Sequence, residues 1–441
     1  MNDLQAKRVV VVGMAKSGIA AVKLLVEHGA RVIALDQKTV TDARLAALGV
    51  EVRPQDPAAI AGSDLVVLSP GVPADADFAE AARRNQIPVI GDLELASWFL
   101  RGDIIGITGA NGKTTTTAMT GHILQSSGIP VQLGGNIGTP PASMVATSRA
   151  GQWNVLELSS FQLETTKTFR AHIGAALNVT PDHLDRHHTF ENYAAAKAKL
   201  FENQTAQDFA VLNADDVVTR GYAGKTNGQV RWFSQSGSVV EGACVAGGRI
   251  LLDDQPLMLT SEVPLRGAHN VENAMAAAVM ARLGGATHEQ IRAAVMSFPG
   301  VEHRLEFIGS LNGVAWYNDS KATNVDATLK AIAAFDGGLW IVLGGKDKGS
   351  DYSPLVAALK NKLEGALLIG AAAQKIESQL AGLPIHRCGT LDAAVRKAYV
   401  RAGSGDTVLL APACASFDQF ENYEHRGREF KRLAMALGVA R

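Results

Sequence analysis

The chain has 441 residues, more than a single hydrophobic core usually supports, so it is expected to divide into several domains. Its 42 lysine and arginine residues nearly balance its 43 aspartate and glutamate residues, which excludes the strong field that gathers nucleic acid or anionic lipid and leaves small molecules as the expected partners. The 3 cysteines lack the CxxC spacing, which excludes a disulfide framework and a cysteine-based zinc site.

Apolar segments of strand length alternate with alanine-rich helical patterns along almost the whole chain. This alternation is typical of α/β folds in which helices cover parallel sheets. It predicts three units, at residues 1–93, 94–299 and 300–441, with β-rich hairpins in the polar stretch 215–265. No apolar run is long enough for a secretory signal or a membrane span, so we expect a cytoplasmic protein without membrane contact.

The first unit opens as a Rossmann-like strand, glycine turn, helix and strand, with the sequence "RVVVVGMAKSGIAAVKLLVEHGARVIALD". Its turn departs from the dinucleotide fingerprint because Ala15 stands where a glycine lets the backbone approach a pyrophosphate, which disfavours a redox cofactor. Asp36 could still accept a ribose or base hydrogen bond, and Lys16 and Ser17 could meet a diphosphate. A Rossmann-like unit that binds nothing here is the alternative.

The second unit begins with a candidate phosphate loop, "DIIGITGANGKTTTT". Only two residues separate Gly109 from Gly112, where the strict pattern has four, but the strand, glycine turn and helix start supply the required setting. Lys113 would reach the β and γ phosphates of ATP, and the Thr114 hydroxyl would ligate Mg²⁺. The alternative is a glycine turn followed by a surface lysine.

Two further segments of this unit place metal-competent side chains after strands. "WNVLELSSFQLE" carries Glu157 near a strand end, where ATPases commonly hold Mg²⁺ or water with a carboxylate. "HIGAALNVTPDHLDRH" runs from a strand into a loop with Asp182 and His183. A lone histidine at such a place is more often structural unless other ligands converge on it.

Lys197 stands among alanines in "ENYAAAKAKLFEN", a predicted helix on which Lys199 must point elsewhere. A helix lysine is ordinarily a solvated surface residue. If Lys197 is desolvated, however, it can lose its proton and take up CO₂ to form a carbamate. That group is a fixed anion able to ligate a second Mg²⁺ ion.

The third unit presents "NDSKATN", "GGKDKGSD" and "PACASFDQF", each directly after a predicted strand. Because ligands of open parallel sheets bind beyond the carboxyl ends of the strands, these loops are expected to gather at one edge. Lys321 and Lys348 would then form a clamp for a dicarboxylate. The alternative is that both are ordinary polar residues of a helix start and a loop.

A set of motifs in this order resembles the Mur ligase family: "TGANGKTTT", "NIG", "LELSSFQLE", "NVTPDHLDRH", "YAAAKAKLF", "GAHNVENAMAA", "FPGVEHRLE", "NDSKATN", "GGKDKG" and "PACASFDQFENYEHRG". The resemblance covers essentially the whole chain and is strongest to the members that add D-glutamate to UDP-N-acetylmuramoyl-L-alanine. It implies an N-terminal Rossmann-like unit for the UDP substrate, a central P-loop-type ATPase with a parallel sheet plus a small β part, and a C-terminal Rossmann-like unit for the amino acid. It also implies ATP, two Mg²⁺ ions and CO₂, held as a lysine carbamate.

The resemblance assigns a role to each matching position. For ATP these are Gly109, Ala110, Asn111, Gly112, Lys113, Thr114, Thr115, Thr116, Asn270, Asn273, Arg304 and Asp319. Catalytic roles fall to Lys113, Glu157, His183 and Lys197, and Mg²⁺ ligation to Thr114, Glu157, His183 and carbamylated Lys197. The UDP substrate takes Lys16, Ser17, Asp36, Ser69, Gly71, Asn136 and His183, and D-glutamate takes Lys321, Thr323, Lys348, Ser416 and Tyr423. Two positions depart from the family pattern, because Ala15 replaces a frequent glycine and Tyr423 stands where phenylalanine also occurs.

Three other functions compete with this interpretation. Folylpolyglutamate synthetase shares the ATP loop and the modified lysine, but that enzyme begins directly with its ATPase domain. A nucleotide-gated switch protein would use the loop for regulation, and an NAD-dependent dehydrogenase would bind nicotinamide at "GMAKSG". A self-contained monomer is the expected oligomeric state.

Overall fold

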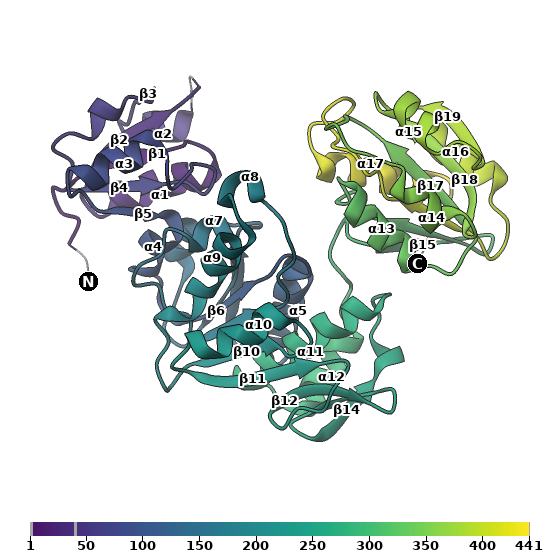
Figure 1. Ribbon diagram of the computed structural model, residues 1–441, viewed down its shortest axis with the longest axis horizontal. Helices are drawn as coiled ribbons and strands as arrows, with labels where there is room; N and C mark the ends of the chain where they lie inside the picture. The colour runs from purple at the N-terminus through teal and green to yellow at the C-terminus, as the bar shows by residue number, and fades with distance from the viewer. Residues whose placement is uncertain (1–2, 39–41, 441) are drawn as a thin grey trace. The chain divides into compact units, whose positions relative to one another are not determined.

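The computed structural model describes residues 3–38 and 42–440, and the chain divides into two compact units (Figure 1). One unit contains residues 1–264 and 268–298, and the other contains residues 265–267 and 299–441. The first unit holds two sheets and the second holds one. Within the described ranges, no helix combines the length and hydropathy that crossing a bilayer requires.

The N-terminal sheet has five parallel strands in the order β3-β2-β1-β4-β5. Its strands are β1 (Arg8–Val12), β2 (Arg31–Asp36), β3 (Val52–Pro54), β4 (Leu65–Leu68) and β5 (Val89–Gly91), and its helices are α1 (Lys16–Glu27), α2 (Ala43–Ala47), α3 (Asp77–Arg84) and α4 (Asp92–Ser97). Strands β1 and β4 are almost wholly buried because helices cover both faces, as their continuous valine and leucine runs require. The sheet is therefore Rossmann-like, as predicted.

The central sheet has nine strands in the order β14-β13-β12-β11-β10-β9-β6-β8-β7. They are β6 (Asp103–Thr108), β7 (Val131–Gly135), β8 (Trp153–Glu157), β9 (Ile173–Ala176), β10 (Phe209–Asn213), β11 (Gln229–Ser234), β12 (Gly242–Ala246), β13 (Arg249–Leu252) and β14 (Gln255–Leu259). Strands β12, β13 and β14 pair antiparallel with a bulge in β13, whereas the rest of the sheet is parallel. The predicted hairpins thus continue the parallel sheet, and part of stretch 215–265 is helix α10 (Val217–Gly221) and parallel strand β11.

Helices pack on both faces of the central sheet. They are α5 (Lys113–Ser126), α6 (Pro141–Met144), α7 (Ser160–Leu163), α8 (Leu184–His187), α9 (Phe190–Glu202), α10, α11 (Ala268–Leu283) and α12 (His288–Met296). Helix α5 directly follows β6 and packs against α11. This pairing brings residues that are far apart in the sequence to the carboxyl edge of the sheet.

The C-terminal sheet has six strands in the order β15-β16-β20-β17-β18-β19. Its strands are β15 (Glu306–Leu311), β16 (Val314–Asn318), β17 (Leu339–Gly344), β18 (Leu363–Ile369), β19 (Ile385–Gly389) and β20 (Thr407–Leu410), and its helices are α13 (Val325–Ala333), α14 (Pro354–Leu359), α15 (Ala373–Gln379), α16 (Leu391–Arg401) and α17 (Tyr423–Ala436). The strands predicted to precede the three loops of this unit are present as β16, β17 and β20. The sequence analysis missed β15 and β19 because these edge strands are partly exposed and lack a continuous apolar run.

A buried carboxylate lies in the first unit at the start of α4. Asp92 is 1% exposed, its Oδ1 accepts a hydrogen bond from the Leu93 amide at 2.8 Å, and its Oδ2 has no partner of good geometry among the described residues. Burial raises the pKa of Asp92 to about 6, although the side chains of Ser17 and Gln162 favour the ionised form. The ionised carboxylate therefore lowers the free energy of unfolding at neutral pH.

We expect Asp92→Asn to stabilise the protein more at pH 8 than at pH 5. An unfolded aspartate ionises near pH 4, whereas folded Asp92 keeps its proton up to a pKa of about 6. The parent therefore loses stability as the pH rises from about 4 through 6, and the full loss is present at pH 8 but only part of it at pH 5. The free energy of unfolding of the variant should exceed that of the parent by roughly 1–3 kcal/mol at pH 8. Urea unfolding at both pH values measures the effect, with the exposed cap variant Asp56→Asn as control. A difference that does not change with pH contradicts the prediction.

Candidate active site

The phosphate loop joins β6 to α5 in a conformation that depends on its glycines. Gly109 and Gly112 have φ values of 156° and 85°, and a Cβ atom at Gly112 would lie 2.3 Å from Asn273 Oδ1. Asn178 holds the loop from the end of β9, since its main-chain and side-chain oxygens accept hydrogen bonds from the amides of Ala110 and Asn111. The loop therefore keeps an open, amide-lined form beside the N-terminus of a 14-residue helix, as anion binding requires.

Two lysines converge on one main-chain oxygen of this loop. The Nζ atom of Lys113 donates to Gly109 O at 2.9 Å and to Ala110 O at 3.0 Å. The Nζ atom of Lys197 donates to the same Gly109 O at 2.8 Å and lies 4.5 Å from the centre of the Tyr193 ring. Lys197 comes from α9, so the fold brings a side chain of that helix to the phosphate loop.

Burial changes the chemistry of Lys197, which is 1% exposed. Desolvation, followed by the positive charge of Lys113, holds the pKa of Lys197 well below its ordinary value, against the opposing charges of Asp182 and Glu157. Lys199, two positions along the helix, instead donates to the main-chain oxygen of Glu164 at 2.8 Å. Lys197 is thus the desolvated lysine that the sequence analysis required for a reactive amine.

Glu157 offers a ligand atom at the same edge of the sheet. It ends β8, is 2% exposed, and accepts a hydrogen bond from Asn136 Nδ2 at 3.0 Å through Oε1. Its Oε2 is buried and has no hydrogen-bond partner among the described residues. A carboxylate oxygen that lacks a donor, together with the hydroxyl of Thr114 at the start of α5, fits a hard cation such as Mg²⁺.

His183 lies near this cluster without a direct contact to Glu157 or Lys197 among the described hydrogen bonds and ion pairs. It adopts a left-handed conformation with φ of 52°, and its side chain is half exposed. The ring centre lies 4.8 Å from that of Phe161 and 6.4 Å from that of Tyr193. The imidazole is therefore accessible to a ligand.

Asn273 of α11 lies beside the phosphate loop and α5, and it is hydrogen-bonded to Asn270 of the same helix. Asn273 Oδ1 accepts from the Thr116 hydroxyl at 3.2 Å, and Asn273 Nδ2 donates to Asn270 Oδ1 at 3.0 Å. Thr115 and Thr116 are buried inside α5. Of the two, Thr116 makes the hydrogen bond to Asn273.

A cavity of about 870 Å³ opens beside the N-terminal sheet. Its lining contains Lys16, Ser17, Asp36, Ser69, Gly71 and Asn136, which are the predicted UDP-substrate residues apart from His183. Asp36 accepts hydrogen bonds from the amides of Met14 and Lys38, and Ser69 donates to Gly13 O at 2.6 Å, so both side chains shape the first turn. Ala15 is extended, with φ of −77°, and this conformation needs no glycine.

In the second unit, hydrogen bonds join the turn that contains Arg304 to the loop that begins at Asp319. The amide of Leu305 donates to Asp319 Oδ1 at 3.3 Å, and the amide of Lys321 donates to His303 O at 3.1 Å. Burial raises the pKa of Asp319 to about 6, against the charge of Arg304. The two predicted ATP contacts of this unit are therefore neighbours.

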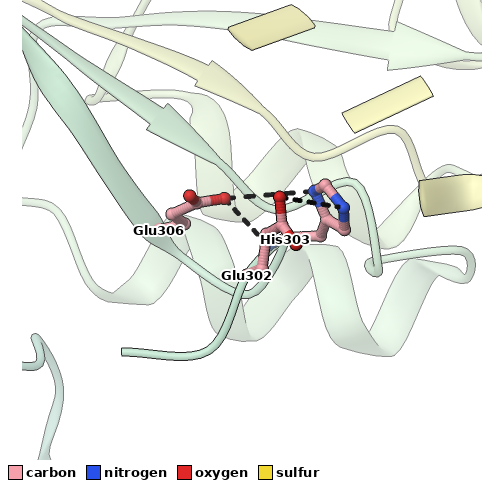
Figure 2. A group of neighbouring side chains, drawn as sticks. All are labelled: Glu302, His303 and Glu306. Atoms are coloured by element: carbon pink, nitrogen blue, oxygen red, sulfur yellow. Dashed lines mark hydrogen bonds and ion pairs between the residues drawn. The ribbon is translucent and has the colours of Figure 1, made fainter. Parts of the chain in front are cut away.

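The same turn contains a group with the spacing of a metal site, Glu302, His303 and Glu306, whose ligand atoms lie within 4.8 Å of one another (Figure 2). Lys431 Nζ donates to Glu302 at 2.9 Å and to Glu306 at 2.7 Å. Asn318 Nδ2 donates to His303 Nδ1 at 2.9 Å, which occupies the lone pair of that nitrogen. An ammonium group already supplies the cation, so we interpret the group as a brace for the turn that carries Arg304.

The strands β16, β20 and β17 are adjacent and parallel, and each is followed by a loop. We call these the acceptor loops: residues 319–323 after β16, 345–350 after β17 and 411–420 after β20. Direct hydrogen bonds join them, from the Lys346 amide to Ala415 O at 2.8 Å and from the Ala413 amide to Ala322 O at 3.0 Å. They carry Lys321, Thr323, Lys348 and Ser416, and Tyr423 begins the following helix, with its ring centre 6.0 Å from Lys321 Nζ. The expected gathering at one sheet edge is confirmed.

Several residues at these sites were not identified from the sequence. Asn178 and Tyr193 lie inside motifs that were quoted for other residues, and Tyr193 precedes Lys197 by one helical turn. Gln162 lines the large cavity. Arg186 packs over Phe161 and donates to Val72 O at 2.8 Å, which ties α8 to the cavity. Single polar residues of this kind carry no recognisable signal in one sequence.

Three family models match the chain in order. They are the MurD-like N-terminal domain of Mur ligases at residues 7–91, the Mur ligase middle domain at 107–281, and the Mur ligase glutamate ligase domain at 303–414. Among solved structures, a UDP-N-acetylmuramate–alanine ligase from Thermotoga maritima is similar with a TM-score of 0.62 and 18% identity, covering 98% of this chain and 100% of that one. This likeness supports the three-domain fold.

Curated relatives align along nearly the full length. A UDP-N-acetylmuramoylalanine–D-glutamate ligase from Solibacter usitatus is 57% identical over 436 residues, which are 98% of this chain and 99% of that protein. The protein of the same name from Koribacter versatilis is 49% identical, covering 99% of this chain and 98% of that protein. The similarity thus includes all three sheets.

Proposed function

Because this chain belongs to the Mur ligase family, we infer that it is an ATP-dependent ligase that adds D-glutamate to UDP-N-acetylmuramoyl-L-alanine in peptidoglycan precursor synthesis. The observation that carries this inference is the alignment with curated D-glutamate ligases along almost the whole chain. The MurD-like N-terminal domain disfavours a folylpolyglutamate synthetase, and the extended turn at Ala15 lacks the fingerprint of a dehydrogenase.

The chemistry begins by activating a carboxylate, because a carboxylate anion resists attack by an amine. Transfer of the γ-phosphoryl group of ATP to the L-alanyl carboxylate gives an acyl phosphate and ADP. The amine of D-glutamate then attacks the acyl carbon, and phosphate leaves through a tetrahedral intermediate. Since the reactants that first meet are both anionic, we propose that Lys113 neutralises and aligns the phosphoryl group.

We propose that Thr114 and Glu157 hold Mg²⁺ beside the phosphates, with His183 and modified Lys197 serving a second ion. When bound, Mg²⁺ would neutralise phosphate oxygens and polarise the transferring group. The unpartnered Oε2 of Glu157 supports this assignment, and Asn136 Nδ2 orients the carboxylate through Oε1. Asn270, Asn273, Arg304 and Asp319 would contact the base, phosphate and ribose of ATP.

We propose that Lys197 is carbamylated. Its unprotonated amine attacks the carbon of CO₂, a C–N bond forms, and one proton leaves the nitrogen for water, which gives an anionic carbamate. The convergence of Lys113 and Lys197 on Gly109 O supports this, because the Lys113 charge disfavours the protonated amine of Lys197, and the reaction turns the neutral amine into an anion that pairs with Lys113. It also creates a carboxylate-type metal ligand.

We propose that the three domains lie near residues 1–93, 94–299 and 300–441 and divide the substrates among them. The 870 Å³ cavity of the first would hold the UDP substrate, and the acceptor loops of the last would hold D-glutamate. A hinge near residue 299 would close to bring the reactants together and to exclude water from the acyl phosphate. We further propose that the protein is cytoplasmic and that it is a monomer. Light scattering would test the monomer by measuring its molar mass.

Phosphate release with ATP, UDP-N-acetylmuramoyl-L-alanine and a panel of amino acids tests the function. We expect release with D-glutamate and none above background with L-glutamate or D-glutamine. A dicarboxylate clamp leaves one lysine unpaired when it meets an amide, which explains the rejection of D-glutamine. Use of another amino acid in preference to D-glutamate contradicts the assignment.

Replacing Lys348 with alanine is expected to raise the KM for D-glutamate by about 10- to 100-fold, the effect of losing a hydrogen bond to a charged group. The KM values for ATP and the UDP substrate should stay within about 3-fold, because Lys348 lies on the C-terminal acceptor loops. Initial rates with each substrate varied in turn measure this. Lys330→Ala, which removes an exposed lysine of the same sheet domain, is the matched control. An equal loss of affinity for all three substrates contradicts the proposed clamp.

A further inference from the structure

Arg426 is a fully buried arginine that lies against the acceptor loops. It belongs to α17, the helix that begins at Tyr423, and its exposure is 0%. Arginine is almost never buried without a partner that compensates its charge, because desolvation of the guanidinium costs several kcal/mol. Its surroundings therefore need an explanation beyond packing.

The guanidinium makes three hydrogen bonds, all to neutral acceptors. Nε donates to Ser320 Oγ at 3.0 Å, Nη2 donates to Ser320 O at 2.8 Å, and Nη1 donates to Cys414 O at 3.1 Å. A Cβ atom built on Gly345 would lie 3.3 Å from Nη1, so the third loop also packs against the group. Arg426 thus touches each of the three acceptor loops.

These contacts lie directly beneath the residues expected to receive D-glutamate. Ser320 precedes Lys321, Cys414 lies two positions before Ser416, and the Ser320 hydroxyl donates to Tyr423 O at 2.8 Å. Ser320 itself is fully buried, so the guanidinium forms a second layer under the loop surface.

The positive charge of Arg426 is not neutralised. Among the residues that the structure describes, no carboxylate forms an ion pair with it. Burial lowers the pKa of Arg426 to about 10, with Cys414 and Asp418 opposing the shift, so the side chain remains a cation at neutral pH. A cation that is surrounded by protein rather than water acts electrostatically over a longer range than a surface lysine.

We propose that Arg426 is a positioning residue for D-glutamate, whose buried charge creates a positive potential at the acceptor loops that is compensated when the dicarboxylate binds. This inference rests on the proposed function, and it extends the amino-acid site beyond Lys321 and Lys348. Without the amino acid, the exposed carboxylate of Asp418 opposes this charge only from a distance, and no ion pair with Arg426 forms among the described residues. Binding of an anion therefore gains energy that a zwitterion with no net charge cannot gain.

Two substitutions of Arg426 distinguish the effect of its charge from the effect of its hydrogen bonds to the acceptor loops. Arg426→Lys keeps the cation but loses the forked geometry, whereas Arg426→Gln keeps a polar donor but loses the charge. We expect Arg426→Gln to raise the KM for D-glutamate by at least about 10-fold relative to Arg426→Lys, since a buried charge acts on the bound carboxylates through protein rather than water. The KM values for ATP and the UDP substrate should agree within about 3-fold between the two variants. Arg432→Lys and Arg432→Gln, on the exposed side of the same helix, are the matched controls.

The outcomes are distinguishable. Equal D-glutamate KM values for Arg426→Lys and Arg426→Gln, or a parallel loss for all substrates, would show that Arg426 only braces the loops and would overturn the proposal. If neither variant folds, Ser320→Ala removes one acceptor and retains the charge. The substitution also removes the hydrogen bond to Tyr423 O. We expect its D-glutamate KM to change less than about 3-fold because the guanidinium charge stays in place, and a rise above about 10-fold would overturn the proposal. Failure of the unmodified enzyme to use D-glutamate would instead contradict the proposed function.

Discussion

Lys197→Ala is expected to lower turnover by at least about 10³-fold, because it removes both the carbamate and the metal ligand that the carbamate would provide. The desolvated amine beside Lys113 has no substitute among the neighbouring residues in the structure as described. Steady-state phosphate release measures the loss. Lys199→Ala, on the same helix, should retain turnover close to that of the parent since its Nζ atom points to Glu164 O.

Added acetate should partly restore Lys197→Ala, because a small carboxylate can occupy the space where the carbamate would provide a metal ligand. Carbon NMR with ¹³C-labelled CO₂ gives a readout that does not depend on activity. A carbamate signal is expected in the parent and in Lys199→Ala, and none at this position in Lys197→Ala. An identical signal in all three proteins, or full activity of Lys197→Ala, contradicts the assignment.

Lys113→Ala is expected to lower turnover by at least about 10²-fold while the protein stays folded, since Lys113 would stabilise charge on the transferring phosphoryl group. Lys113 is half-buried rather than a core residue, so the thermal midpoint should change little. Single-turnover formation of ADP measures the phosphoryl-transfer step. Near-normal ADP formation contradicts this role.

The same variant has a consequence for the neighbouring lysine. Lys113 is the second-largest cause of the lowered pKa of Lys197, after burial. Its removal should therefore raise the pKa of Lys197 and lower the fraction of reactive amine at neutral pH. ¹³C-labelled CO₂ should then give a weaker carbamate signal in Lys113→Ala than in the parent, and an unchanged signal would show that burial alone sets this reactivity.

The sequence predicted the sites whose residues follow strands. The rule that loops at the carboxyl ends of parallel strands share an edge correctly placed Lys321, Lys348 and Ser416 on neighbouring loops. The glycine turn before Lys113 was also predicted, because left-handed backbone at Gly112 requires glycine. These features depend on local geometry, which a short segment can encode.

Features that depend on tertiary burial could not be predicted in the same way. Nothing local distinguishes Arg426 from the exposed Arg432 on the same helix, because the environment of each is set by loops far away in the sequence. The convergence of Lys113 and Lys197 on Gly109 O likewise requires α9 to pack beside β6. The family resemblance pointed to Lys197, but its physical reason became visible in the fold.

The antiparallel end of the central sheet has a consequence for solubility during synthesis. A long sheet exposes unpaired main-chain groups at its outer strands, and such an edge can recruit strands from other chains and start aggregation. Strand β14 is short and contains Pro256, which has no N–H to offer, and the bulge in β13 distorts the adjoining ladder. The polar hairpins therefore hinder pairing of this edge of the central sheet with strands of other chains. A newly synthesised chain can then form its nine-stranded sheet without aggregating through this edge.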